Sequence, residues 1–254
     1  MTTTLANKTI LITGASSGIG EACALMFAEQ GARLILCGRR EERLQALQNK
    51  LVHDYKIPAH TLVLDVRDRV AVKETISSLP EDFKNIDILI NNAGGALGLE
   101  TLATADLDDW DTMIDANIKG VLYLIHAVLP GMYTRKTGHI VNIGSTAAHI
   151  TYRSGSVYCA TKHAVDAISK TLSLESINTG VRVTQIDPGM VETEFSLVRF
   201  KGDAEKAKSL YENFKPLSAK DVADTIYYAI TRPPHVNISE IILYSREQAA
   251  NIPC

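Results

Sequence analysis

Short apolar runs alternate with longer, partly charged segments along almost the whole chain. The first run, Thr9–Thr13, is rich in β-branched residues and predicts a buried strand. Six more runs predict strands at 33–37, 61–64, 86–90, 139–143, 181–186 and 238–244. Strands that alternate with helices in this way predict an α/β domain with one doubly wound, seven-stranded parallel sheet flanked by helices.

Helical spacing of apolar residues fills the gaps between the predicted strands. It covers 21–30 and stops at Gly31, a residue type that is common just beyond a helix end. Long helical signals cover 106–132, where Asn117 stands among apolar residues. Further helices are expected from Glu41, up to about Leu79, over 156–176 and from the capped start at Ser218.

One long segment, at about 190–216, has no clear place in this alternation. Long connections of this kind are often lids over a binding site. No linker, low-complexity stretch or repeat divides the chain. We therefore expect a single domain over residues 1–254 that carries a lid at about 190–216.

Composition and charge are those of an ordinary globular protein. Apolar residues make up 46% of the 254 positions and charged residues 22%, which is enough to bury a core. The net charge of −3 gives no electrostatic reason to expect nucleic acid or an anionic membrane as a partner. The chain starts without a secretory signal, and no apolar stretch approaches the roughly 20 residues of a membrane span. We expect a cytoplasmic protein without membrane contact.

Cysteine and histidine positions give no sign of a metal site. Cys23, Cys37, Cys159 and Cys254 lack zinc-type spacing and are interpreted as cytosolic thiols. The seven histidines likewise show no ligand spacing. We therefore expect no metal.

A glycine-rich turn follows the first predicted strand directly. It reads Gly14-Ala15-Ser16-Ser17-Gly18-Ile19-Gly20 and opens the first helix, so its backbone N–H groups would face an anion. Its spacing differs from the Gly-x-Gly-x-x-Gly of most dinucleotide folds, and glycines are common in plain strand–helix turns. Its place in the first strand–helix unit favours a cofactor phosphate site at Gly14, Ser16, Ser17, Gly18, Ile19 and Gly20.

Arg39 and Arg40 stand at the end of the second predicted strand, where NAD-binding chains carry an acidic residue for the ribose. The planar fork of arginine suits the 2′-phosphate of NADP. The alternative is a solvated basic helix start, which a helix N-terminus disfavours. The pair therefore predicts NADP rather than NAD as the cofactor.

Polar and small residues end two more predicted strands. Ligands of open α/β sheets bind at the carboxyl ends of the strands. Asp65 would either cap the next helix or accept from the adenine amino group, and the two roles are compatible. The further cofactor contacts expected here are Val66, Asn92, Ala93 and Gly94.

Tyr158 and Lys162 are four positions apart on a predicted helix, so their side chains share one face. A nearby ammonium lowers the pKa of a phenol, which would let Tyr158 exchange a proton with a substrate hydroxyl near neutral pH. By itself this spacing occurs by chance in many helices. Its meaning depends on the other motifs of the chain.

Four separated motifs agree: Thr13-Gly14-x-x-x-Gly18-x-Gly20, Asn91-Asn92-Ala93-Gly94, Ser145 at a strand end, and Tyr158-x-x-x-Lys162. With these, the chain resembles the short-chain dehydrogenase/reductase family over nearly its whole length. The resemblance implies a Rossmann fold, a homotetramer and a catalytic set of Asn117, Ser145, Tyr158 and Lys162. It also implies nicotinamide contacts at Pro188, Gly189, Val191 and Thr193.

In the roles that the resemblance implies, Tyr158 is the general acid/base and Ser145 donates to the substrate oxygen. Lys162 lowers the pKa of Tyr158 and contacts the nicotinamide ribose, and Asn117 holds a water that links Lys162 to solvent. These roles make the protein an NADP-dependent oxidoreductase. The same four residues serve many substrates, so they leave the substrate open.

A closer resemblance, to the NADP-dependent 3-hydroxy acid dehydrogenases, lies in the motifs at 38–44, 143–147 and 193–203. It implies oxidation of serine, allo-threonine and related 3-hydroxy acids, or reduction of the matching carbonyls. A carboxylate substrate needs a cationic partner, and we expect Arg199, with Arg153 second; either is alternatively a plain surface arginine. The other hypotheses are a reductase for bulkier carbonyls and a non-catalytic NADP-binding regulator.

Overall fold

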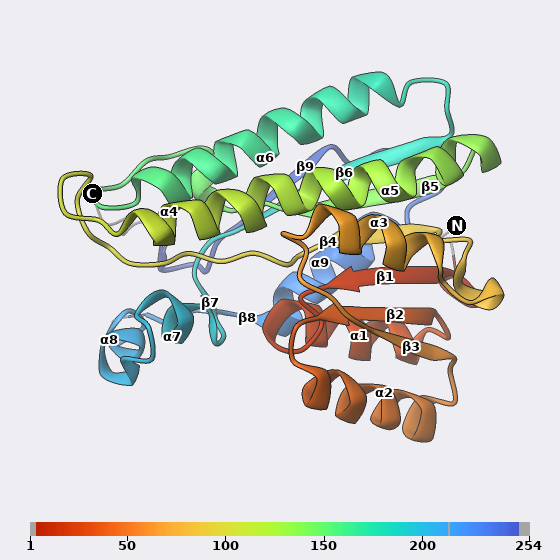
Figure 1. The fold of residues 1–254 in the computed structure, drawn as a ribbon, viewed down its shortest axis with the longest axis horizontal. Coiled ribbons are helices and arrows are strands. Elements are labelled where there is room, and N and C mark those ends of the chain that lie inside the picture. The colour runs from red at the N-terminus through yellow and green to blue at the C-terminus, as the bar shows by residue number, and fades with distance from the viewer. Residues whose placement is uncertain (1–3, 213, 249–254) are drawn as a thin grey trace.

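A seven-stranded parallel sheet forms the centre of the molecule in the computed structural model, which describes residues 4–212 and 214–248 (Figure 1). The strand order is β3-β2-β1-β4-β5-β6-β9, and each neighbouring pair is parallel. The strands are β1 (Thr9–Thr13), β2 (Arg33–Gly38), β3 (Ala59–Val63), β4 (Ile88–Asn91), β5 (Gly138–Ile143), β6 (Val181–Pro188) and β9 (Glu240–Leu243). The predicted fold class is confirmed.

Helices cover both faces of this sheet, which is why its central strands β1 and β4 are buried along their whole length. One core layer is formed by α1 (Gly18–Glu29), α2 (Glu41–Tyr55) and α9 (Ala219–Ile230). The opposite layer is formed by α3 (Arg69–Ser77), α5 (Gly120–Arg135) and α6 (Ser156–Glu175). From β1 the sheet is extended on one side by β2 and β3 and on the other side by β4 and the later strands. The strand order therefore switches between β1 and β4, and a ligand crevice is expected at the carboxyl ends of these two strands.

Three short elements join the main ones near the strand ends. They are η1 (Glu81–Phe83), the π-helical turn η2 (Asp115–Lys119) and η3 (Thr146–Ala148). The π turn η2 connects α4 (Leu107–Ile114) to α5 without a break. Turns of this kind are rare and occur mostly at functional sites.

Segment 191–218 contains two short helices and a small second sheet. Helices α7 (Phe195–Arg199) and α8 (Ala204–Ser209) lie between β7 (Val191–Glu192) and β8 (Leu217–Ser218), which pair with each other. Figure 1 shows α7 and α8 set apart from the two helix layers. We call 190–216 the lid segment; its role as a lid stays a prediction.

Most differences from the sequence prediction concern the ends of elements. The third and last strands, predicted at 61–64 and 238–244, occupy Ala59–Val63 and Glu240–Leu243. Helix α1 starts at Gly18, three residues before the predicted position, because the glycine turn itself enters the helix. The sequence offered Asp65 as a possible cap of α3, but Asp68 is the cap. Its carboxylate accepts hydrogen bonds from the amides of Val70 and Ala71.

The continuous helical run Leu107–Arg135 is long and apolar enough, by length and composition alone, to cross a membrane. The expectation that no segment approaches that length is therefore wrong. Core helices of soluble proteins pass the same test. Here Leu124, Val128 and Met132 are buried in the core layer beneath the sheet, and Asn117 is 1% exposed. The packing is that of a core helix.

Candidate active site

The four predicted catalytic residues come from three separate elements. Tyr158 and Lys162 lie on the buried face of α6, Ser145 follows β5, and Asn117 lies in η2. All four are buried. The helical spacing of the sequence is thus realised, with both Tyr158 and Lys162 facing the end of β5.

Burial dominates the ionisation of Tyr158 and Lys162. Burial raises the pKa of Tyr158 above its usual value, and the nearby Ser145 side chain opposes this shift. Burial also lowers the pKa of Lys162 to about 8, against the opposing charge of Asp187. The expected lowering of the Tyr158 pKa by Lys162 is not found in this structure. Burial is the largest cause of the raised pKa of Tyr158. Lys162 Nζ lies 5.8 Å from the Tyr158 ring centroid and donates to the Ile143 carbonyl at 2.8 Å.

Asn117 holds two parts of the site together. Its Oδ1 accepts from the Gly95 amide at 2.9 Å, and its Nδ2 donates to the Gly95 carbonyl at 2.9 Å and to Thr161 Oγ1 at 3.0 Å. Thr161 lies on α6 between Tyr158 and Lys162, and its hydroxyl donates to the Tyr158 carbonyl. The Asn117 side chain is therefore used in fixing α6 to the loop after β4. Its expected contact with a water stays a prediction.

The glycine turn has the shape of an anion cradle. Gly14 has a φ of +65°, and a Cβ on Gly20 would lie only 2.3 Å from the Gly14 carbonyl oxygen, so both positions require glycine. Asn92 Nδ2 donates to the Thr13 carbonyl at 2.8 Å and holds the turn against the end of β4. The first turn of α1 has no side-chain cap, which leaves its amides for a ligand.

Arg40 reaches the same turn from the end of β2. Its guanidinium donates to Ser16 Oγ at 3.1 Å and to Ser17 Oγ. It also forms an ion pair with Glu194 of the lid segment at 2.7 Å, and Arg43 contacts the same carboxylate at 2.7 Å. Hydrogen bonds from Arg40 and Arg43 lower the pKa of Glu194 to about 2. Glu194 and Arg43 lie in motifs that carry the closer resemblance, but the sequence did not predict their ion pair.

The remaining predicted cofactor residues lie around these strand ends. Arg39 is exposed beside Asp65, whose carboxylate is bound by Arg67 at 2.6–3.0 Å. Hydrogen bonds from Arg67 lower the pKa of Asp65, so it stays an acceptor. Ile19, Val66 and Ala93 pack against the two apolar core layers. Pro188 ends β6 and Gly189 follows it, while Val191 and Thr193 lie at the start of the lid segment. Thr193 packs against Gly18 of the turn: a Cβ placed on Gly18 would lie 3.3 Å from the Thr193 side chain.

Arg199 is a buried cation held by neutral partners. It is 9% exposed, its Nε donates to the Gly98 carbonyl at 3.2 Å, and its Nη2 donates to the Tyr152 hydroxyl at 2.8 Å. Its guanidinium carbon lies 5.6 Å from the centroid of the Tyr158 ring. No acidic side chain of residues 4–212 and 214–248 forms a salt bridge with it. Arg153, the second candidate, is exposed and lacks such an environment.

A narrow cavity adjoins Tyr158 and Arg199. Glu100, Asp109, Trp110 and Met113 line it together with these two residues. The Arg199 guanidinium is thus next to the phenol at one side of the cavity.

Comparison with known proteins shows to which family this chain belongs. Residues 8–203 match the profile of the short chain dehydrogenases. The chain belongs to the short-chain dehydrogenase family. It is 49% identical over 233 residues to the NADP-dependent 3-hydroxy acid dehydrogenase YdfG of Salmonella typhi, which covers 91% of this chain and 92% of that protein. It is 47% identical over 241 residues to sulfoacetaldehyde reductase 2 of Chromohalobacter salexigens, covering 94% and 95%.

Among solved structures, the closed form of a serine dehydrogenase in complex with NADP⁺ superposes with a TM-score of 0.92. It is 46% identical, and the match covers 97% of this chain and 98% of that one. The protein is accordingly an NADP-dependent short-chain dehydrogenase that acts on CH–OH groups. The predicted cofactor is confirmed. The glycine turn 14–20, where Gly14 and Gly20 leave no room for a Cβ, and the Arg40–Ser16–Ser17 cluster fit its phosphates.

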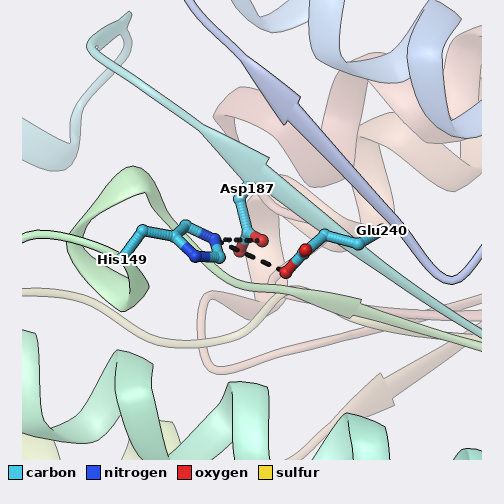
Figure 2. Close-up of side chains that lie close together, drawn as sticks. All are labelled: His149, Asp187 and Glu240. Atoms are coloured by element: carbon cyan, nitrogen blue, oxygen red, sulfur yellow. Dashed lines mark hydrogen bonds and ion pairs between the residues drawn. The ribbon is translucent and has the colours of Figure 1, made fainter.

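One cluster in this short-chain dehydrogenase was missed by the sequence analysis. His149, Asp187 and Glu240 converge from η3, β6 and β9, and their ligand-type atoms lie within 4.8 Å of one another (Figure 2). The histidines show no ligand spacing along the chain, and the expectation of no metal stays a prediction. The residues are 38 and 53 positions apart, so only the parallel sheet brings them together. The neighbouring Gly144 leaves room for Asp187, because a Cβ there would overlap the carboxylate.

Proposed function

We propose that this short-chain dehydrogenase oxidises the 3-hydroxyl of short 3-hydroxy acids, or reduces the matching carbonyls, with Tyr158 as general acid/base. The observation that carries the proposal is Arg199. A buried guanidinium without an acidic partner among the described residues favours an anionic ligand. Because Arg199 lies against the Tyr158 ring, a molecule that reaches both with a carboxylate and a hydroxyl must be short.

In this mechanism the Tyr158 phenolate takes the proton of the substrate hydroxyl, and Ser145 donates a hydrogen bond to the same oxygen. Bound NADP⁺ would supply the hydride acceptor for the carbon that carries this hydroxyl. Tyr158 is poorly ionised while buried, so it needs an additional positive charge to act as a base near neutral pH. Lys162, on the same face of α6, is the residue that supplies it. Asn117 keeps α6 in place through Thr161.

The relatives support this substrate class. One is named for 3-hydroxy acids and one structure for serine, and both substrates carry a hydroxyl two carbons from a carboxyl group. A second candidate class is sulfonates, favoured by the relative named sulfoacetaldehyde reductase. A sulfonate is also a small anion that a guanidinium binds with two hydrogen bonds. The structure suits either anion at Arg199.

A substrate panel with NADP⁺ tests the proposal. We expect turnover of serine, allo-threonine, 3-hydroxypropionate or 3-hydroxyisobutyrate, and little turnover of serinamide, which lacks the carboxylate. Preference for 2-hydroxyethanesulfonate would select the sulfonate class. Turnover of sterols or bulky secondary alcohols alone would select the alternative of a reductase for bulkier carbonyls.

The variant Tyr158→Phe keeps the ring and removes the proton carrier. We expect kcat to fall about 10²–10⁴-fold while NADP⁺ still binds. Full activity of this variant would remove Tyr158 from the mechanism. Binding of NADP⁺ by the wild-type protein without turnover of any alcohol or carbonyl would favour the non-catalytic regulator.

We further propose a homotetramer in the cytoplasm, with the lid segment opening and closing over the substrate. Support comes from the family resemblance of the sequence and from the short helices of 191–218 that stand outside the main layers. Light scattering measures the oligomeric state, and a monomer of 27.7 kDa in solution would contradict the tetramer.

A further inference from the structure

The cluster of His149, Asp187 and Glu240 lies at the carboxyl ends of β5 and β6 and at the start of β9. Figure 2 shows the three side chains pointing toward one another. His149 Nε2 lies 2.9 Å from Asp187 Oδ2 and 3.5 Å from Glu240 Oε1. One imidazole nitrogen therefore stands between two carboxylates.

Asp187 connects this cluster to the catalytic serine. It is fully buried, and its Oδ1 accepts a hydrogen bond from the backbone amide of Ser145 at 2.8 Å. Gln185 Nε2 donates to both oxygens of the same carboxylate, at 3.0 and 2.9 Å. The Asp187 carboxylate thus fixes the backbone of Ser145, whose hydroxyl is needed at the substrate oxygen.

The hydrogen-bond donors around Asp187 indicate a proton-sharing cluster rather than a cation site. Each of its oxygens already accepts from two nitrogens, those of Ser145, Gln185 and His149. A metal ion would have to displace these donors. A proton on Glu240, whose carboxylate faces His149 and Asp187, needs no such displacement.

The charges around the cluster favour retention of one proton. Two buried or half-buried carboxylates repel each other, and burial together with the Asp187 charge raises the pKa of Glu240. Glu240 Oε1 is buried without a hydrogen-bond partner in the described chain. The other charged groups that face the cluster are Lys162 toward Asp187, Lys170 toward Glu240, and Asp166, 3.4 Å from Gln185 Nε2.

We propose that His149, Asp187 and Glu240 form a proton-holding cluster that positions the catalytic Ser145 through its backbone amide. The inference rests on the proposed role of Ser145 in catalysis. While the cluster holds its proton, it carries one net negative charge, and the hydrogen bond between the Ser145 amide and Asp187 is kept. When the pH rises and the proton leaves to solvent, the two carboxylates separate and Ser145 shifts. His149 and Glu240 are therefore positioning residues rather than catalytic ones.

The direct test follows the Ser145 amide by NMR, which needs no substrate. In protein labelled with ¹⁵N-serine, the Ser145 signal is identified as the one lost in Ser145→Ala. We expect the pH titration of this signal in the wild-type protein to lose its cluster component in Glu240→Gln, which needs no shared proton, while the titration of Lys162 contributes equally to both. Glu175→Gln, the same change at an exposed end of α6, serves as the control and should titrate like wild type.

The kinetic arm uses whichever substrate the panel identifies. We expect His149→Gln to lower kcat about tenfold, with the NADP⁺ dissociation constant unchanged within about twofold. Glu240→Gln should shift the alkaline limb of kcat by about one pH unit relative to Glu175→Gln. Lys162, with a pKa of about 8, also titrates at alkaline pH. Because Lys162 is present in all variants, a difference between the pH profiles of Glu240→Gln and Glu175→Gln reports on the cluster.

Several results would overturn the proposal. One is a Ser145 amide that does not titrate, or that titrates equally in wild type and Glu240→Gln. Another is a loss of thermal stability in His149→Gln and Glu240→Gln with unchanged kcat and pH profile, which would indicate a purely structural role. Activity that is lost with EDTA and restored by Zn²⁺ or Mg²⁺ would assign the cluster to a cation. Failure of the substrate panel would count against the proposed function alone, because the NMR titration does not depend on it.

Discussion

Two arginines at opposite ends of the site differ in burial and in their partners. Arg40 is expected to bind a cofactor phosphate, and Arg199 the substrate carboxylate. Arg40, at the cofactor end, has a side chain that is 42% exposed and is paired with Glu194. Arg199, at the substrate end, is 9% exposed, and its hydrogen-bond partners among the described residues are the Gly98 carbonyl and the Tyr152 hydroxyl. Arg40 is thus paired with a carboxylate of the same chain, whereas Arg199 is hydrogen-bonded to neutral groups.

The difference implies two modes of binding. An exposed ion pair contributes only about 0–1 kcal/mol, so a phosphate can replace Glu194 at Arg40 at little cost. A buried guanidinium without a counter-charge is costly, so an incoming carboxylate relieves an unfavourable state. We therefore expect the cofactor phosphate to bind by exchange and the substrate carboxylate by neutralisation. Substrate affinity should then depend on Arg199 more steeply than NADP affinity depends on Arg40.

The largest effect is expected for Arg199→Gln. Loss of the buried cation should lower kcat/KM for the 3-hydroxy acid about 100-fold, because a desolvated charge pair is lost. The dissociation constant of NADP⁺, measured by fluorescence, should not change. Arg153→Gln is the matched control, since Arg153 is exposed, and it should keep wild-type kinetics. Unchanged kinetics of Arg199→Gln would show that the carboxylate binds elsewhere.

The next largest effect is expected for Arg40→Gln at the cofactor end. We expect the dissociation constant of NADP⁺ to rise about tenfold, and that of NAD⁺ to stay the same, because only NADP⁺ has the 2′-phosphate. Arg43→Gln removes the other partner of Glu194 but leaves Ser16 and Ser17 untouched, so it serves as a control for the ion pair alone. Equal weakening of both cofactors would place Arg40 at the pyrophosphate instead.

A smaller effect is expected for Tyr152→Phe. The change removes the hydroxyl that holds Arg199 Nη2 and leaves the ring on which the guanidinium lies. Loss of one hydrogen bond to a charged group is worth about 1.5–3 kcal/mol at most, and the remaining contacts hold the arginine. KM for the hydroxy acid should rise about fivefold, with kcat little changed. A fall in kcat equal to that of Tyr158→Phe would instead place Tyr152 at the reacting atoms.

The sequence predicted the parts of the site that depend on local spacing. Tyr158 and Lys162 needed only the helical period, and the glycine turn needed only its position between β1 and α1. Asn117 was recognisable as a polar residue in an apolar run, although the π turn that presents it was not. The seven strands followed from their apolar runs, while their ends shifted by up to two residues.

The missed contacts all join residues far apart in the chain. Glu194 reaches Arg40 across 154 positions, and Arg199 reaches Gly98 across 101. Tyr152 and the cluster of His149, Asp187 and Glu240 have no periodic spacing either. Such pairings are set by how the lid segment and the strand ends fold together, which no local pattern encodes. The ionisation of Tyr158 was misjudged for a similar reason, because burial outweighs the neighbouring charge.

The smallest effect, and the sharpest test of the exchange model, is expected for Glu194→Gln. Removal of the competing carboxylate should tighten NADP⁺ binding about threefold and leave NAD⁺ unchanged. Because the pKa of Glu194 is lowered from 4.5 to about 2, its ion pairs are complete above pH 4.5 and are lost only as the pH falls through about 2. The difference between wild type and Glu194→Gln should therefore be constant from pH 6 to 9 and shrink as salt screens the pair. Weaker NADP⁺ binding in Glu194→Gln would reverse the interpretation, because Glu194 would then hold Arg40 in place for the phosphate.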